Sequence, residues 1–197
     1  MILNTVLQNY KVVLASKSPR RHQLLNELGI RFTVATMEVH EGYPPELQKE
    51  SVALYLAEKK SDAMADTLKP QTILITADTI VCIDDRVLNK PAGYEEAVEM
   101  LKTLSGRKHE VITGVCLRTA DKKILFHEIT SVYFKRLSDD EIGYYLDHYQ
   151  PYDKAGAYGV QEWIGLIGLE RIDGSFHNVM GLPVQALYQR LNELLKP

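Results

Sequence analysis

The sequence has few cysteines and no long apolar run. Of its 197 residues two are cysteine and one is tryptophan. Cys82 and Cys116 lie in separate apolar stretches, which argues against a disulfide-rich scaffold or a cysteine-ligated metal and favours buried, reduced thiols. No apolar stretch approaches the roughly 20 residues of a membrane span, and the N-terminal residues lack a basic-then-apolar signal pattern. These absences predict a cytoplasmic protein that does not enter a membrane.

The sequence also lacks an excess of positive charge. It has 23 Lys and Arg against 26 Asp and Glu, which gives a formal net charge of -3. Nucleic-acid binding over a broad face normally needs a basic excess and is not expected, whereas a small anion needs only a local basic pocket. A Walker-type phosphate loop, a Rossmann glycine fingerprint and a Gly-x-Ser-x-Gly elbow are all missing, which argues against the enzymes that depend on them. The six histidines show no metal-ligand spacing.

The chain has 45% hydrophobic and 25% charged residues, and this composition is ordinary for a globular protein. We expect one domain over residues 1–197 with an α/β or α+β core, because helical periodicity alternates with hairpin patterns. Helices are predicted from Ser18, over residues 51–66 and 94–104, from a capping box at Ser138 and Glu141, and from Pro183. Strands are predicted over residues 12–14, 31–39, 72–76, 80–83, 111–118 and 124–134, with residues 77–79 lying between two of them.

Residues 14–21 read Leu-Ala-Ser-Lys-Ser-Pro-Arg-Arg and combine the features of an anion site. Ser18 suits the N-cap of a helix and Pro19 its first residue. Arg20 and Arg21 then fall in the first turn, where a cation is unfavourable by about 0.3–1 kcal/mol because the helix dipole is positive there. Free helix N–H groups, two guanidinium groups and two serine hydroxyls predict binding of a multiply charged anion such as phosphate. The alternative is a solvated, basic start of a helix.

Two acidic residues are candidates for catalysis or metal binding. Asp78 interrupts an apolar stretch, and a buried carboxylate costs several kcal/mol unless it is paired, bound to a metal or open to a cleft. The alternative is a strand-end aspartate satisfied by backbone N–H groups. Glu41 follows the second expected strand, and the two carboxylates would suit Mg²⁺ or Mn²⁺, which prefer oxygen ligands. An acidic residue before a proline-rich loop is otherwise simply solvated.

Several further residues could contact a nucleotide. Lys60 flanks the apolar side of its predicted helix, and Lys90 precedes a proline at the start of a rigid loop. Either lysine could reach a phosphate, although a surface lysine is the ordinary interpretation. Lys154 and Tyr158 lie in a segment of small residues that permits close approach of a ligand. Tyr158 could stack on a base or simply pack in the core.

Together these motifs resemble the Maf family of nucleoside triphosphate pyrophosphatases. The resemblance implies an α/β fold of two lobes, a mixed sheet with flanking helices and a central cleft, similar to the inosine triphosphate pyrophosphatase architecture, and a homodimer. It also implies hydrolysis of a nucleoside triphosphate to the monophosphate and pyrophosphate, with a divalent metal, Mg²⁺ or Mn²⁺, as cofactor. The matching segments follow the family's order: residues 14–21 (LASKSPRR), 77–81 (ADTIV), 90–91 (KP), 105–115 (SGRKHEVITGV), 153–161 (DKAGAYGVQ) and 179–183 (VMGLP).

The resemblance also implies roles for individual residues. Asp78 matches the proton acceptor, and Glu41 with Asp78 would hold the metal. Thr79 and Gln161 place the chain in the branch that acts on dTTP and UTP, since the 7-methyl-GTP branch carries Ser-Asp-Gln where this chain has Ala-Asp-Thr. Arg20 falls at the third specificity position. Other residues match polar positions of the substrate cleft: Ser16, Arg21, Glu41, Lys60 and Lys90.

The sequence departs from the family pattern at two places. Gln150 stands where glutamate often precedes proline, and Glu162 stands where glycine often follows the glutamine. The second change adds bulk and charge beside Gln161, which bears on the strictness of base preference rather than on the triphosphate chemistry.

Other functions remain open at this point. The family is associated with inhibition of septum formation, so a non-catalytic nucleotide-binding regulator of cell division is the alternative to an enzyme of nucleotide-pool housecleaning. A pyrophosphatase acting on CTP or on modified nucleotides is a second alternative. The combination of Asp78 with Lys60 and Lys90 favours an enzyme, because a pure binder does not need a group that activates water.

Overall fold

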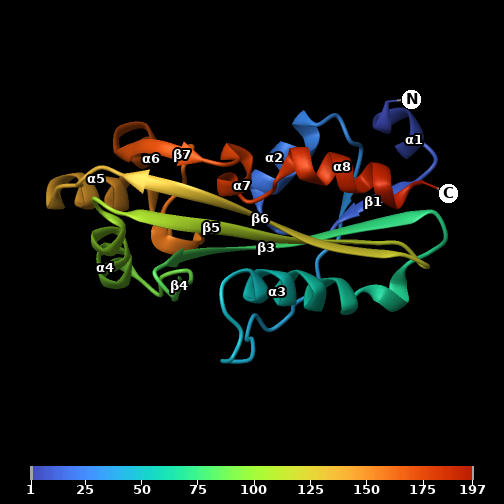
Figure 1. Cartoon of the computed structure of the whole chain (residues 1–197), viewed down its shortest axis with the longest axis horizontal. Coiled ribbons are helices and arrows are strands. Elements are labelled where there is room, and N and C mark those ends of the chain that lie inside the picture. Colours follow the sequence, from blue (N-terminus) through green and yellow to red (C-terminus); the bar gives the residue numbers. More distant parts are fainter. Residues whose placement is uncertain (1, 197) are drawn as a thin grey trace.

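The computed structural model describes residues 2–196, which fold around one mixed sheet (Figure 1). Its strands are β1 (Lys11–Leu14), β2 (Thr33–Val34), β3 (Thr72–Ile83), β4 (Arg86–Leu88), β5 (Lys108–Arg118), β6 (Lys123–Phe134) and β7 (Leu169–Asp173). The strand order is β2-β1-β3-β5-β6-β7, and β4 pairs with β3 off this path. β1 runs parallel to both β2 and β3, whereas every other pairing is antiparallel. The sheet therefore has the mixed α/β character that the sequence predicts.

Helices cover both faces of this sheet. They are α1 (Leu3–Leu7), α2 (Pro19–Glu27), α3 (Glu50–Asp62), α4 (Tyr94–Leu104), α5 (Asp139–Tyr149), α6 (Trp163–Gly168), α7 (Phe176–Met180) and α8 (Val184–Leu194), with 3-10 turns η1 (Ala65–Thr67) and η2 (Ala155–Ala157). In Figure 1 the long strands β3, β5 and β6 run along the molecule, with α3 below them and α2, α7 and α8 above. The helices α4, α5 and α6 gather at one end, so the elements form two groups along the same strands.

β3 is buried on both faces, which explains its nearly continuous apolar sequence. Ile73 and Ile75 belong to the main core, whereas Ile80 packs with Val52 and Leu56 of α3. Because side chains alternate along a strand, Thr76, Asp78 and Ile80 share the face that α3 covers. The strand therefore presents Asp78 to α3, on the same face as Ile80.

Most predicted elements are confirmed, and two strand predictions are wrong. Residues 94–104 form a helix with the predicted bounds, and the capping box of α5 is present. Residues 31–39 contribute only the two exposed residues of β2, because their pairing with β1 extends no further. Residues 72–83 form one unbroken strand, so Asp78 lies inside a strand and not at a strand end. Its backbone pairs with Gly114 of β5, and a side-chain partner offsets the burial of its charge.

Three short helices, α1, α6 and α7, were not predicted, since each has only five or six residues and too little periodicity to be detected. Across residues 2–196, no helix combines the length and the apolar character that crossing a membrane requires.

Candidate active site

A pocket forms where one edge of β3 is left open. β1 pairs with β3 as far as Ile75 and β4 pairs with it from Val81, so within the described chain residues 76–80 have a strand partner only on the β5 side. Side chains from both faces of a sheet can reach a pocket that wraps around such an edge. The pocket has a volume of about 830 Å³. Its lining includes every residue predicted for the site: Ser16, Arg20, Arg21, Glu41, Lys60, Asp78, Thr79, Lys90 and Gln161.

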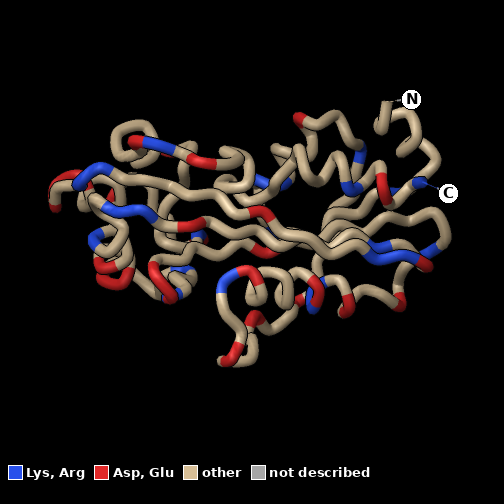
Figure 2. Tube along the Cα trace, viewed as in Figure 1, with Lys and Arg blue, Asp and Glu red and all other residues tan. Residues whose placement is uncertain are grey.

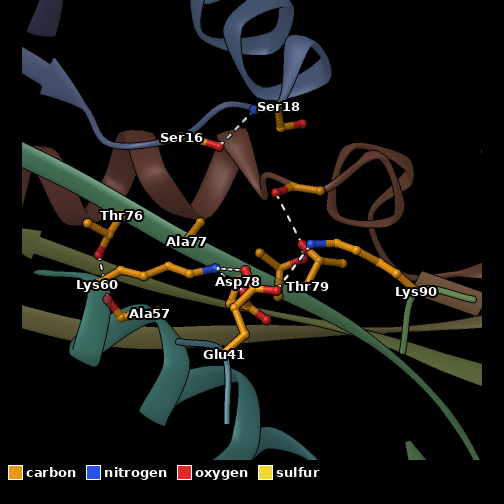
Figure 3. A network of polar contacts seen from close by, with 12 residues as sticks. Ser16, Ser18, Glu41, Ala57, Lys60, Thr76, Ala77, Asp78, Thr79 and Lys90 are labelled. Carbon is orange, nitrogen blue, oxygen red and sulfur yellow. Dashed lines mark hydrogen bonds and ion pairs between the residues drawn. The ribbon is translucent and has the colours of Figure 1, made fainter. Parts of the chain in front are cut away.

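Four charged side chains form a chain of alternating sign along one wall (Figure 3). The Lys60 ammonium of α3 donates to Asp78 Oδ1 of β3 and, over 2.8 Å, to Glu41 Oε1. Lys90, which follows β4, donates to Glu41 Oε2 over 3.1 Å. The side chain of Asp78 is 12% exposed and that of Lys60 is 19% exposed, so their charges are largely shielded from water. The structure thus joins residues from four separate segments into one ionic network.

The network keeps Glu41 ionised. Burial by itself would raise the pKa of Glu41, but hydrogen bonds and charge from Lys60 and Lys90 lower that pKa to about 2. The carboxylate therefore carries its full charge at any pH near neutrality.

Close packing of α3 against the sheet brings Lys60 to Asp78. Asp78 is paired across the sheet with Gly114 of β5. A Cβ atom at Gly114 would lie 2.4 Å from the backbone carbonyl of Ala53 in α3, so any larger residue would displace the helix. Thr76 further fixes the helix by donating a 2.6 Å hydrogen bond to the Ala57 carbonyl. Gly114 and Thr76 together set the distance between the helix and the strand that carries Asp78.

The Arg21 guanidinium is engaged by the protein itself. Its Nε donates to the Gly181 carbonyl over 2.8 Å, Nη1 donates to the Ala77 carbonyl over 2.9 Å, and Nη2 donates to Thr79 Oγ1 over 2.9 Å. A longer bond of 3.3 Å reaches Ser16 Oγ. Burial lowers the pKa of Arg21 while the charge of Asp78 opposes that change, and arginine stays protonated. Arg21 therefore shapes the pocket, because it donates a hydrogen bond to the Ala77 carbonyl on the open edge of β3.

The hydroxyl of Thr79 belongs to a network of hydrogen bonds. It accepts from Arg21 and lies 2.9 Å from Thr113 Oγ1, which in turn lies 3.2 Å from the Asn178 carbonyl. Each threonine has one proton and a further acceptor, the Gly181 carbonyl at 3.4 Å for Thr79 and the Asn178 carbonyl for Thr113, so either hydroxyl can donate in the contact between them. The hydroxyl is thus satisfied by protein groups on the face opposite Asp78.

The start of α2 is arranged as predicted, except for its cap. Ser18 occupies the N-cap position and Pro19 the first turn, but among the described residues the Ser18 side chain receives no capping hydrogen bond. Instead the Ser18 backbone N–H donates to Ser16 Oγ over 3.2 Å (Figure 3). Both serines line the pocket, so a hydroxyl and the positive end of the helix face it.

The opposite wall contains a second set of charges, which the sequence predictions missed in part. Arg20 Nη1 lies 3.1 Å from Asp153 Oδ2, and Lys154 Nζ lies 2.7 Å from Asp153 Oδ1. Burial acts to raise the pKa of Asp153, but Lys154 and Arg20 lower it below its ordinary value. Lys154 was identified as a candidate because of the small residues around it. Asp153 belongs to the motif at residues 153–161, but no role beside Arg20 was predicted for it.

The donor set suits a hard cation only in part. Within residues 2–196 no group of three or more His, Cys, Asp and Glu side chains is placed to hold a metal ion. The Glu41 and Asp78 carboxylates do converge, because both contact the Lys60 ammonium. Mg²⁺ is commonly held by one or two carboxylates together with substrate phosphates and water. The two carboxylates therefore fit a metal that arrives with a phosphorylated substrate.

Comparisons with known proteins give a family match, similar relatives and a similar fold. The family model described as Maf-like protein matches residues 11–194. A Bacteroides fragilis protein called dTTP/UTP pyrophosphatase is 52% identical over 189 residues, covering 95% of this chain and 98% of the relative. A Parabacteroides distasonis protein of the same name is 54% identical over 186 residues, with 94% and 96% coverage. Among solved structures, the Staphylococcus aureus Ham1 protein has a similar fold, with a TM-score of 0.52, 16% identity and coverage of 93% and 99%.

Proposed function

The chain belongs to the Maf-like protein family, and from that premise we propose that it hydrolyses nucleoside triphosphates, preferentially dTTP and UTP, to the monophosphate and pyrophosphate. The curated relatives that are about half identical to it are named for this reaction. The observation that carries the proposal is the contact of Lys60 with both Asp78 and Glu41, in a pocket that the start of α2 also lines. This arrangement puts a proton acceptor, Asp78, and a cation, Lys60, in a single pocket.

The reaction needs a base for water and positive charge for the phosphates. A triphosphate repels an attacking water, so cations that meet the developing charge lower the barrier. Asp78 orients the water and accepts its proton, while Lys60 and Lys90 turn from their carboxylate partners toward the phosphates. Arg20 and Ser16 contact phosphate oxygens from the opposite side, together with the N-terminus of α2. A divalent metal held by Glu41 and Asp78 would neutralise phosphate charge and increase the acidity of a bound water.

Base preference rests on Gln161 in this proposal. Gln161 is exposed and lines the pocket, in the segment that follows η2. Thymine and uracil both present O2, N3–H and O4, and an amide offers one donor and one acceptor group to that edge. Thr79 acts through Arg21 and the pocket wall, since its hydroxyl is already bonded.

The distribution of charge supports a small anionic substrate over a nucleic acid. Figure 2 shows acidic and basic positions interspersed along the trace. The net charge of -3 agrees with a local basic pocket and disfavours an extended polyanion surface. A cytoplasmic location fits a substrate from the nucleotide pool, and a homodimer and a role in septum formation stay predictions from the family resemblance.

A nucleotide panel tests the proposal. The purified protein is incubated with ordinary and modified nucleoside triphosphates plus Mg²⁺ or Mn²⁺, and released pyrophosphate is measured. We expect pyrophosphate from dTTP and UTP at rates well above those from purine nucleotides. Recovery of a tightly bound, intact nucleotide in the presence of metal would favour the non-catalytic regulator.

A further inference from the structure

Glu162, the residue that departs from the family pattern, contacts Lys154 and Gly159, which line the pocket, and Tyr145 of α5. Gln161 lines the pocket, whereas the carboxylate of Glu162 is only 20% exposed and lies between two other side chains. Its Oε1 is 3.1 Å from Lys154 Nζ, and its Oε2 accepts the hydroxyl proton of Tyr145 in α5. The acid is thus a structural partner of the segment that precedes it.

Through Lys154, Glu162 is linked to Arg20, which lines the pocket. Lys154 is 10% exposed, so its ammonium depends on the carboxylates around it. One of these is Glu162 and the other is Asp153, which in turn pairs with Arg20. The four side chains form an ionic chain of alternating sign from Glu162 to Arg20. Asp153 is 58% exposed and is a weaker anchor than a shielded carboxylate.

Through Tyr145, Glu162 is also linked to the backbone of residues 153–161. The Tyr145 hydroxyl donates to Glu162 and accepts a 3.0 Å hydrogen bond from the buried Gly159 N–H. Glu162 also packs directly on Gly159, where an added Cβ would lie 2.7 Å from Glu162 Cδ. Residues 153–161 are therefore tied to Glu162 near both ends, through Lys154 and through Gly159.

From these contacts we propose that Glu162 is a positioning residue that preorganises residues 153–161, and through them Arg20 and Gln161, for the nucleotide. The inference rests on the proposed function for the identity of that nucleotide. Asp78 and Lys60 lie on β3 and α3 and have no part in this chain. Loss of Glu162 should thus weaken nucleotide binding, because the segment must then be ordered at the expense of binding energy, and should spare the chemical step.

The test compares Glu162→Gln, which keeps the shape of the side chain, with Glu162→Ala and with Tyr145→Phe. Glu170→Gln is the matched control, because Glu170 is an exposed glutamate on β7. Steady-state kinetics with UTP give KM and kcat separately, and amide hydrogen exchange reports on residues 153–161 without reference to activity.

We expect Glu162→Gln to raise KM roughly 5–20-fold with kcat within about twofold, a change typical of one or two lost interactions. Exchange should accelerate at Gly159 and its neighbours and stay unchanged in β3 and α3. Tyr145→Phe should shift both readouts in the same direction, and its effect should not add fully to that of Glu162→Gln. Glu170→Gln should leave every value as in the parent protein.

Unchanged exchange over residues 153–161 in Glu162→Ala overturns the inference. A fall in kcat at constant KM also overturns it, as does a lower KM, since that would mean Glu162 competes with the nucleotide for Lys154. Failure of the proposed function is distinct, because the parent protein would then release no pyrophosphate from any nucleotide while the exchange experiment still reports on Glu162.

Discussion

Arg21 and Gly181, which are 160 positions apart in the chain, are joined by a 2.8 Å hydrogen bond from the guanidinium Nε to the glycine carbonyl. The same side chain donates to the Ala77 carbonyl on the open edge of β3. Gly181 has φ of 114° and follows α7, so its carbonyl is presented by a turn that favours glycine. Arg21 thereby connects α2, β3 and the turn after α7 around one pocket.

This relationship predicts different effects at two adjacent arginines. Arg21→Lys should lower the free energy of unfolding by about 2–4 kcal/mol, because a lysine cannot reach the separate acceptors and leaves carbonyl groups unsatisfied. Arg20→Lys should change stability by less than about 0.5 kcal/mol, since Arg20 makes one ion pair with a half-exposed aspartate. Urea unfolding of the two variants measures the difference. Equal stabilities would contradict a structural role for Arg21.

Asp78→Asn should reduce kcat by about 10²–10⁴-fold, the usual contribution of general base catalysis. The asparagine has nearly the same shape but accepts no proton, and it weakens the pairing with Lys60. Pyrophosphate release from dTTP and UTP measures the rate, and near-ultraviolet circular dichroism checks that the fold is retained. A rate close to that of the parent protein would remove Asp78 from the mechanism.

Gln161→Ala should reduce the preference for dTTP and UTP over purine triphosphates by roughly 10-fold or more, because one or two hydrogen bonds to the base are lost. Gln161 is exposed at the pocket, so the fold should be unaffected. The ratio of kcat/KM values between UTP and GTP is the appropriate measurement. If that ratio stays the same, Gln161 does not read the base.

The His109 side chain should make stability depend on pH. Its ring is buried and bonds to the Tyr158 hydroxyl over 2.7 Å. Burial lowers the pKa of His109 to about 4, with a smaller opposing effect from the Arg107 backbone, whereas an unfolded histidine titrates near 6.5. The unfolded chain therefore binds the proton first, so stability is full above pH 6.5 and falls as the pH drops toward 4. The loss should reach up to about 3 kcal/mol.

His109→Gln isolates this effect from the other histidines. Glutamine keeps a hydrogen-bonding group toward Tyr158 but does not titrate. The difference in unfolding free energy between the parent and the variant should shrink as the pH falls from 6.5 to 4. A difference that is constant over this range would mean that His109 has an ordinary pKa.

Local patterns in the sequence were sufficient for much of the fold. The helix over residues 94–104, the capping box at Ser138 and Glu141, and the adjacent strands over residues 111–118 and 124–134 depend on neighbouring residues, so they were correctly predicted. The expected break at residues 77–79 was wrong because Asp78 remains in a strand when β5 continues the ladder and Lys60 supplies a counter-charge. A strand partner and a counter-charge from distant segments cannot be read from local periodicity.

Nine residues that line the pocket could be identified from the sequence, through residue types at ordered motifs and through the resemblance to a family. Their hydrogen-bond partners could not be identified in this way, since each side chain makes a limited number of hydrogen bonds and segments distant in the chain supply the acceptors. The Arg21 guanidinium donates to Gly181, Ala77 and Thr79 and so connects the segments around the pocket. Arg20, one residue earlier, lies on the surface of the pocket and pairs with Asp153.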